Sequence, residues 1–153
     1  MNCIIRKGMP SDIPRVFALI MELATFEKAP EEVIHTPEKL LADGFGENPL
    51  YSLWVADSGT DIIGMALCYI RYSTWKGPCL YLEDIVVTAD QRNRGIGKAL
   101  FDAVMAYATQ KEYAQVNWQV LDWNTPAIRF YEKTGAAFDP HWINVSLRTP
   151  FHS

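Results

Sequence analysis

Apolar residues follow helical spacing in the first third of the chain. They recur at intervals of three and four over residues 13–26, directly after the start signal Pro-Ser-Asp. A second, shorter helix is predicted over residues 36–44, because Thr36 offers an N-cap, Pro37 suits the first helical position and Gly44 suits the end. Two helices are therefore expected before the first long strand.

Strand patterns dominate the middle of the chain, where β-branched and aromatic residues are separated by turn signals. The predicted strands are residues 3–6, 51–57, 62–72, 79–88, 114–123 and 137–148. Between the last three of these strands lie two more predicted helices. One has Ile96, Leu100, Val104, Tyr107 and Ala108 on a single face, and the other covers residues 125–135, with Thr125 as cap and Pro126 at its start.

The order of these elements predicts a fold class. It is strand, two helices, three strands, helix, strand, helix, strand, without an internal repeat or a linker. We predict a single α/β domain over residues 1–153, built on a mixed sheet. An antiparallel middle followed by a βαβ unit disfavours a simple doubly wound sheet.

Composition limits the classes of binding partner and the cellular compartment that we expect for this protein. The formal net charge of −4 argues against a nucleic-acid partner. The longest apolar patch, residues 16–21, stops at Glu22 and is too short to span a membrane, so no membrane partner is expected. Cys3, Cys68 and Cys79 form no CxxC and are interpreted as reduced core thiols of a cytoplasmic protein. The histidines show no metal-ligand spacing, and no metal is predicted.

The stretch "QRNRGIGKAL" at residues 91–100 precedes a predicted helix. It fails the Walker pattern, because Arg92 stands where that pattern needs glycine. It also fails the dinucleotide fingerprint, which requires a small residue at the position of Leu100. It does fit R-x-x-G-x-G at a strand-to-helix junction, where glycines and exposed amides suit an anion. From these residues alone, a surface turn with solvated arginines is an equal alternative.

Several motifs in order resemble the GCN5-related N-acetyltransferase (GNAT) family. They are "FEK" at 26–28, "DGFGENPLY" at 43–51, "STWKG" at 73–77, "YLEDIVV" at 81–87, "RNRGIGK" at 92–98 and "LDWNTPAIRFYEKTGA" at 121–136. Within it they resemble the diamine acetyltransferases, which include the spermidine/spermine N1-acetyltransferases, and most of all their thialysine N-epsilon-acetyltransferase branch. The resemblance implies a mostly antiparallel sheet flanked by helices, acetyl-CoA as cosubstrate, a small-molecule amine as substrate, and a homodimer.

The resemblance also implies a cofactor site along three segments. The backbone that would pair with the pantetheine arm belongs to Ile85, Val86 and Val87. The diphosphate would be held by the loop that begins at Arg92, through the amides of Asn93, Arg94, Gly95, Ile96, Gly97 and Lys98. Contacts further along the cofactor would come from Asn124, Thr125, Pro126 and Ala127.

The resemblance makes Tyr131 the general acid and Glu83 the residue that binds the substrate and draws off the amine proton. Phe26 and Glu27 match a pair at the substrate mouth. The chemistry is consistent with these roles: a lysine-like amine with a pKa near 10.4 arrives protonated, and a tyrosine hydroxyl can donate to a leaving thiolate. The spacing alone favours Tyr131 as a core residue, since it follows Ile128 at helical spacing, and only the resemblance favours the catalytic role.

Asp84 and Trp75 are two further positions with a bearing on the site. Glu83 and Asp84 are neighbours on a predicted strand, so we expect them to face opposite sides of the sheet. Trp75 is either a turn aromatic packed on the sheet or a substrate contact.

Three departures from the family sharpen the expectation. Ser73 stands where the polyamine-specific enzymes have aspartate, and "FDPHW" at residues 138–142 is shorter than their acidic stretch, which favours a lysine or thialysine substrate. Asn93 replaces the usual glycine, and asparagine tolerates the left-handed conformation that the loop needs. Alternatives to this function are a protein N-terminal or lysine acetyltransferase and a non-catalytic acyl-CoA sensor.

Overall fold

The computed structural model describes residues 2–151 and divides into two compact units, one ending at Gln119 and one beginning at Val120. A single domain over residues 1–153 stays a prediction. The elements of the first unit are β1 (Ile4–Lys7), α1 (Ile13–Phe26), α2 (Pro37–Phe45), β2 (Ser52–Asp57), β3 (Ile62–Ser73), β4 (Gly77–Val87), α3 (Ile96–Gln110) and β5 (Val116–Asn117). Short 3-10 helices add Pro10–Asp12, Pro30–Glu32 and Ala89–Gln91.

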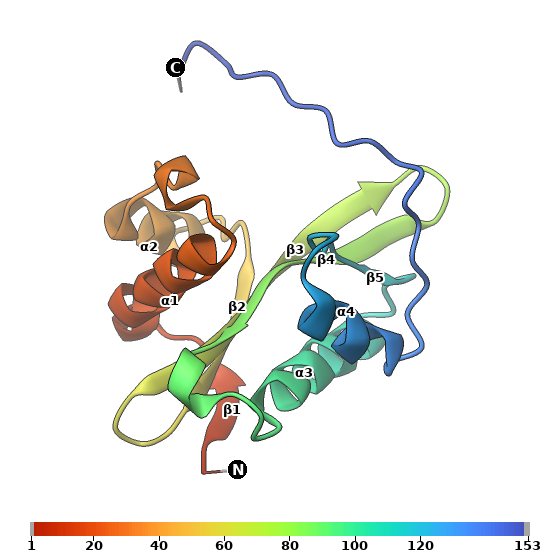
Figure 1. The fold of residues 1–153 in the computed structure, drawn as a ribbon. Coiled ribbons are helices and arrows are strands. Elements are labelled where there is room, and N and C mark those ends of the chain that lie inside the picture. Colours follow the sequence, from red (N-terminus) through yellow and green to blue (C-terminus); the bar gives the residue numbers. More distant parts are fainter. Residues whose placement is uncertain (1, 152–153) are drawn as a thin grey trace. The chain divides into compact units, whose positions relative to one another are not determined.

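The sheet of the first unit has the order β1-β2-β3-β4-β5. Neighbouring strands are antiparallel from β1 to β4, and β5 joins β4 in parallel. The prediction of a mixed, mostly antiparallel sheet is confirmed, as is the position of β1 at its edge. Helices α1 and α2 lie over one face and α3 lies over the other (Figure 1).

Each face of the sheet has its own buried side chains. Under α1 and α2 the core consists of Ile13, Val16, Leu19, Leu40, Leu53, Val55, Ile62, Met65, Leu67 and Val86. On the α3 face the ring of Trp54 meets Tyr107 edge-on at 4.9 Å, and Leu100 and Val104 are fully buried. The spacing that predicted helices and strands reflects this two-sided burial.

Most predicted helix boundaries agree with the structure. Helix α1 ends at Phe26 as expected. Thr36 caps α2, since its hydroxyl oxygen accepts from Lys39 N at 3.2 Å, and the helix ends at Phe45, one residue beyond the predicted Gly44. The start of α1 differs in detail, because the carboxylate of Asp12 makes no capping bond.

Asp12 instead closes an ion-pair network with Arg6 and Asp57, which we call the Arg6 network. Arg6 donates to the two Asp12 carboxylate oxygens at 2.8 and 3.0 Å, and its Nε donates to Asp57 Oδ2 at 3.0 Å. Asp12 also accepts from Met9 N at 2.7 Å and is only 6% exposed. The network joins β1, β2 and the start of α1.

Strand β5 is much shorter than predicted. The pattern indicated residues 114–123, but only Leu80↔Val116 and Tyr81↔Asn117 pair. Beyond these pairs Trp118 meets the ring of Phe101 edge-on at 5.4 Å. Trp118 therefore owes its place in the apolar pattern to a side-chain contact with α3, whereas Leu121 and Trp123 are 36% and 43% exposed, so the pattern here does not report a longer strand.

The second unit contains α4 (Thr125–Glu132). The cap is Asn124, whose side chain accepts from Ala127 N at 3.4 Å, so the prediction of Thr125 as cap is wrong by one residue. The helix ends before the predicted residue 135, since Gly135 has φ 82°.

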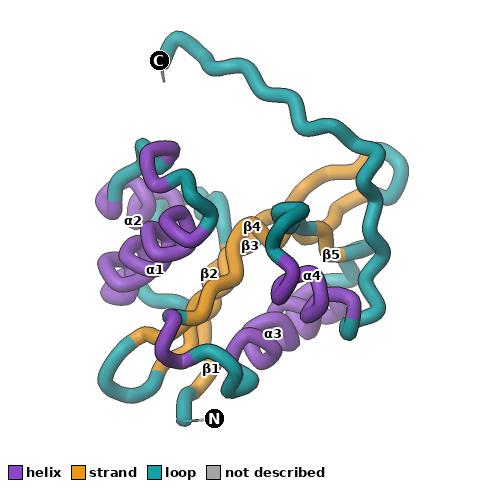
Figure 2. The backbone as a smooth tube through the Cα atoms, viewed as in Figure 1, coloured by secondary structure: helices purple, strands orange, loops and turns teal. Residues whose placement is uncertain are grey.

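The strand predicted over residues 137–148 is absent from the described part of the chain, where loop follows α4 (Figure 2). Ile143, Val145 and Leu147 alternate with polar residues as in a half-buried strand, yet they are 86%, 90% and 95% exposed. A strand needs a partner for its backbone, and the alternation does not supply one.

None of the helices described for residues 2–151 combines the length and the apolar composition that a membrane span requires. The cysteines are unpaired, and Cys68 and Cys79 are buried as predicted, whereas Cys3 is partly exposed and does not belong to the core. Across the same residues His, Cys, Asp and Glu side chains form no group of three or more that could hold a metal ion.

Candidate functional site

Strand β4 changes its pairing halfway along. At Leu80 and Tyr81 it has β3 on one side and β5 on the other. Between Leu82 and Val87 the only strand that pairs with it within residues 2–151 is β3, because β5 ends at Asn117. Backbone donors and acceptors along this open edge can pair with an extended ligand. Ile85, Val86 and Val87 lie on this edge.

A β-bulge interrupts the same strand. Leu67 pairs with Asp84 and Cys68 pairs with Leu82, so Glu83 is an extra residue without a partner on β3. Leu67 belongs to the core under α1 and α2, which places Asp84 on that face. Tyr81 lies on the same face through its pairing with Tyr69, two residues beyond Leu67.

Glu83 shares this face with Asp84, since it follows Tyr81 by two residues. Burial is the main reason that the pKa values of Tyr69, Tyr81 and Asp84 are raised, and the negative charge of Glu83 adds to each shift. The prediction that Glu83 and Asp84 face opposite sides of the sheet is therefore wrong. The bulge is the physical reason, because an extra residue breaks the alternation of side chains.

Glu83, Asp84 and Glu27 form what we call the acidic cluster. Burial is the main reason that the pKa of Asp84 rises to about 6, and the charges of Glu83 and Glu27 add to the shift. Burial also raises the pKa of Glu27, the residue that follows α1. In the described part of the chain no lysine or arginine forms an ion pair with these carboxylates. Such a cluster attracts a cation.

Asp84 is a candidate that the sequence did not reveal. The bulge is defined by how β4 pairs with β3, and nothing in "YLEDIVV" indicates that this strand has one residue more than its partner. The only available signal was two adjacent carboxylates inside an otherwise apolar strand, which is costly unless they serve a function.

The connection from β4 to α3 has the backbone expected of an anion-binding loop. Asn93 has φ 63° and Gly95 has φ 80°, which confirms that asparagine adopts the left-handed conformation here. Gly95 is the N-cap of α3 and has no side chain to cap it. The amides in the first turn of α3 therefore have no partner inside the helix and suit an anion.

Gly97 provides a test of whether this loop fits a diphosphate. It is helical with an ordinary φ, and a Cβ built there would meet only Val87 Cγ2, at 3.8 Å. Packing within the protein therefore does not require glycine, although glycine costs a helix about 1 kcal/mol relative to alanine. A ligand approaching the first-turn amides closely does require it, so the loop fits the group that the motif implies.

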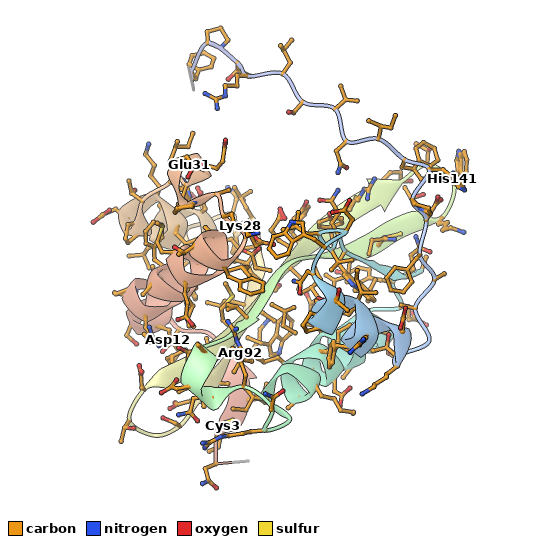
Figure 3. The ribbon with its side chains drawn as sticks, viewed as in Figure 1. Cys3, Asp12, Lys28, Glu31, Arg92 and His141 are labelled. Atoms are coloured by element: carbon orange, nitrogen blue, oxygen red, sulfur yellow. The ribbon has the colours of Figure 1, made fainter. Side chains whose placement is uncertain are left out.

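The basic side chains of this loop are differently engaged. Arg92, labelled in Figure 3, donates from Nε to Val87 O at 3.0 Å, and its guanidinium lies 5.5 Å from the centre of the Phe26 ring. Lys98 Nζ pairs with Asp102 Oδ2 at 2.6 Å on the surface of α3. Arg94 is exposed and lines a polar hollow of about 470 Å³ beside the loop. No member of the acidic cluster lines that hollow, so it is not the candidate site.

The turn between β3 and β4 contains Ser73 and Trp75. Ser73 Oγ accepts from Trp75 N at 3.2 Å and from Lys76 N at 3.1 Å, so the serine shapes the turn. Trp75 is 85% exposed, which contradicts the interpretation of a turn aromatic packed on the sheet. Phe26, at the end of α1, is 40% exposed.

The second unit carries the remaining candidates, on α4. Tyr131 is 7% exposed, and its ring lies 5.4 Å from that of Phe130. Asn124, Thr125, Pro126 and Ala127 form the capped start of the helix. The assignments of catalytic, cofactor and substrate residues stay predictions.

Known proteins place this chain among acetyltransferases. The model of the acetyltransferase (GNAT) family matches residues 16–136. A thialysine N-epsilon-acetyltransferase from Bos taurus is 40% identical over 140 residues, which cover 86% of this chain and 82% of the relative. The spermidine/spermine N(1)-acetyltransferase-like protein 1 from Homo sapiens is 34% identical over 86% of this chain and 20% of its own length.

A solved structure agrees at the level of the fold. An aminoglycoside N-acetyltransferase in complex with CoA superposes with a TM-score of 0.75 at 21% identity, over 96% of this chain and 95% of the other. The resemblance inferred from the sequence motifs is confirmed. The chain belongs to the acetyltransferase (GNAT) family and is an acetyl-CoA-dependent N-acetyltransferase.

Proposed function

We propose that this enzyme acetylates the primary amine of a small molecule of the lysine or thialysine type. The observation that carries the proposal is the acidic cluster, in which Glu83 and Asp84 of β4 meet Glu27 from the end of α1. The cluster has no basic partner within residues 2–151, and its β4 members lie on the part of the strand with the open edge. A cation-attracting group next to a place for an extended thioester is what amine acetylation needs.

The chain's own residues would hold acetyl-CoA along the three segments that the motifs indicate. The backbone of Ile85 to Val87 pairs with the pantetheine arm, and the amides from Asn93 to Lys98 bind the diphosphate. The start of α4, from Asn124 to Ala127, binds further along. When bound, acetyl-CoA supplies the acetyl thioester.

Glu83 prepares the amine. A lysine-like ammonium, with a pKa near 10.4, is attracted by the acidic cluster and must lose a proton before it can attack. The Glu83 carboxylate accepts that proton, directly or through a water. Asp84, with its pKa raised to about 6, is mostly ionised at neutral pH and adds to the negative field.

Tyr131 completes the reaction. Its hydroxyl, of a type with a pKa near 10, donates a proton to the departing thiolate. The amine attacks directly, so no nucleophilic side chain takes part. Phe26, Glu27 and Trp75 contact the substrate.

The choice of substrate rests on two facts. A relative that is 40% identical is a thialysine N-epsilon-acetyltransferase. Ser73, where polyamine-specific enzymes have an aspartate, supplies no negative charge. Polyamines are therefore expected to be poorer substrates.

We also propose a cytoplasmic homodimer. The three unpaired cysteines favour a reducing compartment, and the exposed alternating residues Ile143, Val145 and Leu147 suit pairing with a second copy. Light scattering of the chain and of a version ending at residue 140 tests this. A dimer that becomes a monomer on truncation supports it, and a full chain that is monomeric at micromolar concentration contradicts it.

A thiol-release assay with an amine panel tests the substrate. The panel contains thialysine, lysine, spermidine, a lysine peptide and a peptide with a free N-terminus. Thialysine and lysine should give the highest kcat/KM. Faster turnover of spermidine would overturn the preference, faster turnover of the peptides would indicate a protein acetyltransferase, and CoA binding without turnover of any amine would indicate a sensor.

A further inference from the structure

The turn that leads from β4 into the anion-binding loop is held by helix α1 at two points. The Glu22 carboxylate accepts from Thr88 Oγ1, at 3.2 Å to Oε1 and 3.0 Å to Oε2, and from Ala89 N at 2.9 Å. One helical turn later, Phe26 lies against the Arg92 guanidinium. Residues one turn apart share a helix face, so one strip of α1 contacts both ends of this turn.

Glu22 supplies a cap that the turn lacks. Thr88 is the N-cap of the 3-10 helix Ala89–Gln91, but its side chain makes no capping bond and donates to Glu22 instead. The Ala89 amide, at the helix start, also donates to Glu22. A carboxylate from another element therefore satisfies the end of this short helix.

The far end of the turn is closed by Arg92, whose Nε donates to Val87 O. The chain then enters the left-handed positions Asn93 and Gly95, from which α3 begins. The path of the backbone into the loop amides is consequently fixed by contacts at Thr88, Ala89 and Arg92. Two of these contacts are made by Glu22 and one by Phe26.

The charge of Glu22 argues against a role in attracting the cofactor. A negative side chain near a diphosphate repels it and by itself weakens binding. The hydrogen bonds of Glu22 indicate a different role, because they attach the start of the loop to α1. The same helix ends next to Glu27 of the acidic cluster, so α1 supports both the cofactor loop and the amine site.

We propose that Glu22 is a positioning residue for the acetyl-CoA loop, acting through Thr88 and Ala89. The inference rests on the proposed use of the loop amides for the diphosphate. It predicts that loss of the Glu22 carboxylate weakens acetyl-CoA binding and leaves the chemical step and amine binding nearly unchanged.

The experiment measures CoA affinity by calorimetry, and separately KM for acetyl-CoA, KM for thialysine and kcat. Glu22→Ala should raise the Kd for CoA and the KM for acetyl-CoA about tenfold, which corresponds to about 1.4 kcal/mol. Glu22→Gln keeps an oxygen that can accept from Ala89 N, and it should stay within about threefold of the wild type. Thr88→Val should raise Kd by about threefold, and adding it to Glu22→Ala should add little.

The matched control is Glu47→Ala, which removes the same charge from an exposed loop position and should change none of these values. Thermal unfolding of every variant separates loss of fold from loss of binding. If Glu22→Ala does not fold, Thr88→Val decides: a Thr88→Val protein with wild-type Kd overturns the inference.

Two outcomes separate this inference from the proposed function. A wild-type chain that fails to bind CoA overturns both. The inference alone is overturned if the wild-type chain binds CoA and Glu22→Ala binds it equally well. It is also overturned if Glu22→Ala lowers kcat and raises both KM values together.

Discussion

Two groups of charged side chains in the first unit are built on opposite principles. The Arg6 network brings one guanidinium between two carboxylates, with each distance at or below 3.0 Å. The acidic cluster brings Glu27, Glu83 and Asp84 together with no basic partner in residues 2–151. The first group is complete within the protein, whereas we propose that the cationic substrate completes the second.

The pKa values record this difference in sign. The Arg6 hydrogen bonds hold the pKa of Asp12 below its ordinary value, in spite of its burial. Burial, with like charges nearby, raises the pKa of Asp84 to about 6. Carboxylates with raised pKa values and no partner are typical of functional sites, whereas a paired buried carboxylate serves the fold.

Removing the proton acceptor should have the largest effect. Glu83→Gln keeps the shape but cannot take a proton, so kcat/KM for thialysine should fall by about 10²- to 10⁴-fold. Steady-state kinetics measure this change, and the unfolding temperature should be unchanged. Activity within threefold of the wild type would show that Glu83 is not the base.

Breaking the Arg6 network should affect stability and not chemistry. Asp12→Ala leaves Asp57 as the one carboxylate partner of Arg6 and removes the acceptor of Met9 N, at a cost of about 3 kcal/mol in the free energy of unfolding. Urea denaturation measures this cost, and kcat of the folded enzyme should be retained. Because the pKa of Asp12 is lowered by folding, its contribution is present above its unfolded pKa and is lost as the pH falls into the acid range.

Neutralising Asp84 should raise the free energy of unfolding, whereas the change at Asp12 lowers it. Its pKa rises from 3.8 to about 6 on folding, so the fold loses stability as the pH rises through this interval. Asp84→Asn should therefore gain on the order of 2 kcal/mol at pH 8 and nothing at pH 3. Denaturation at both pH values is the measurement. An equal change in stability at the two pH values would contradict the raised pKa of Asp84. KM for the amine should also rise in the variant.

Adding a negative charge at position 73 should have the smallest effect of these changes, and it should act on substrate preference. Ser73→Asp retains an oxygen for the turn and adds a carboxylate, so KM for spermidine should fall by about threefold relative to thialysine. Competition between the two amines in one assay gives this ratio directly. Ser73→Asn, without the charge, is the control and should leave the ratio unchanged.

The sequence predicted the parts of the fold that burial determines. Helices α1 and α3 and strands β2 to β4 follow from apolar spacing, and the Asn93–Gly95 backbone follows from residues that tolerate positive φ. The motif resemblance supplied the family.

The sequence alone could not predict which strand segments pair with one another. The extent of β5 depends on where β4 offers an edge, and the strand expected over residues 137–148 has no partner in this structure. The bulge at Glu83 depends on the register of β3, so Asp84 could not be assigned to the site from its own neighbours. Each of these features is a relation between two segments.

The most direct test of the account is a crystal structure of the enzyme with bound CoA. The account predicts the pantetheine arm paired with the backbone of Ile85 to Val87, and diphosphate oxygens within hydrogen-bond distance of amides between Asn93 and Lys98. A diphosphate bound elsewhere, with these amides facing solvent, would contradict it.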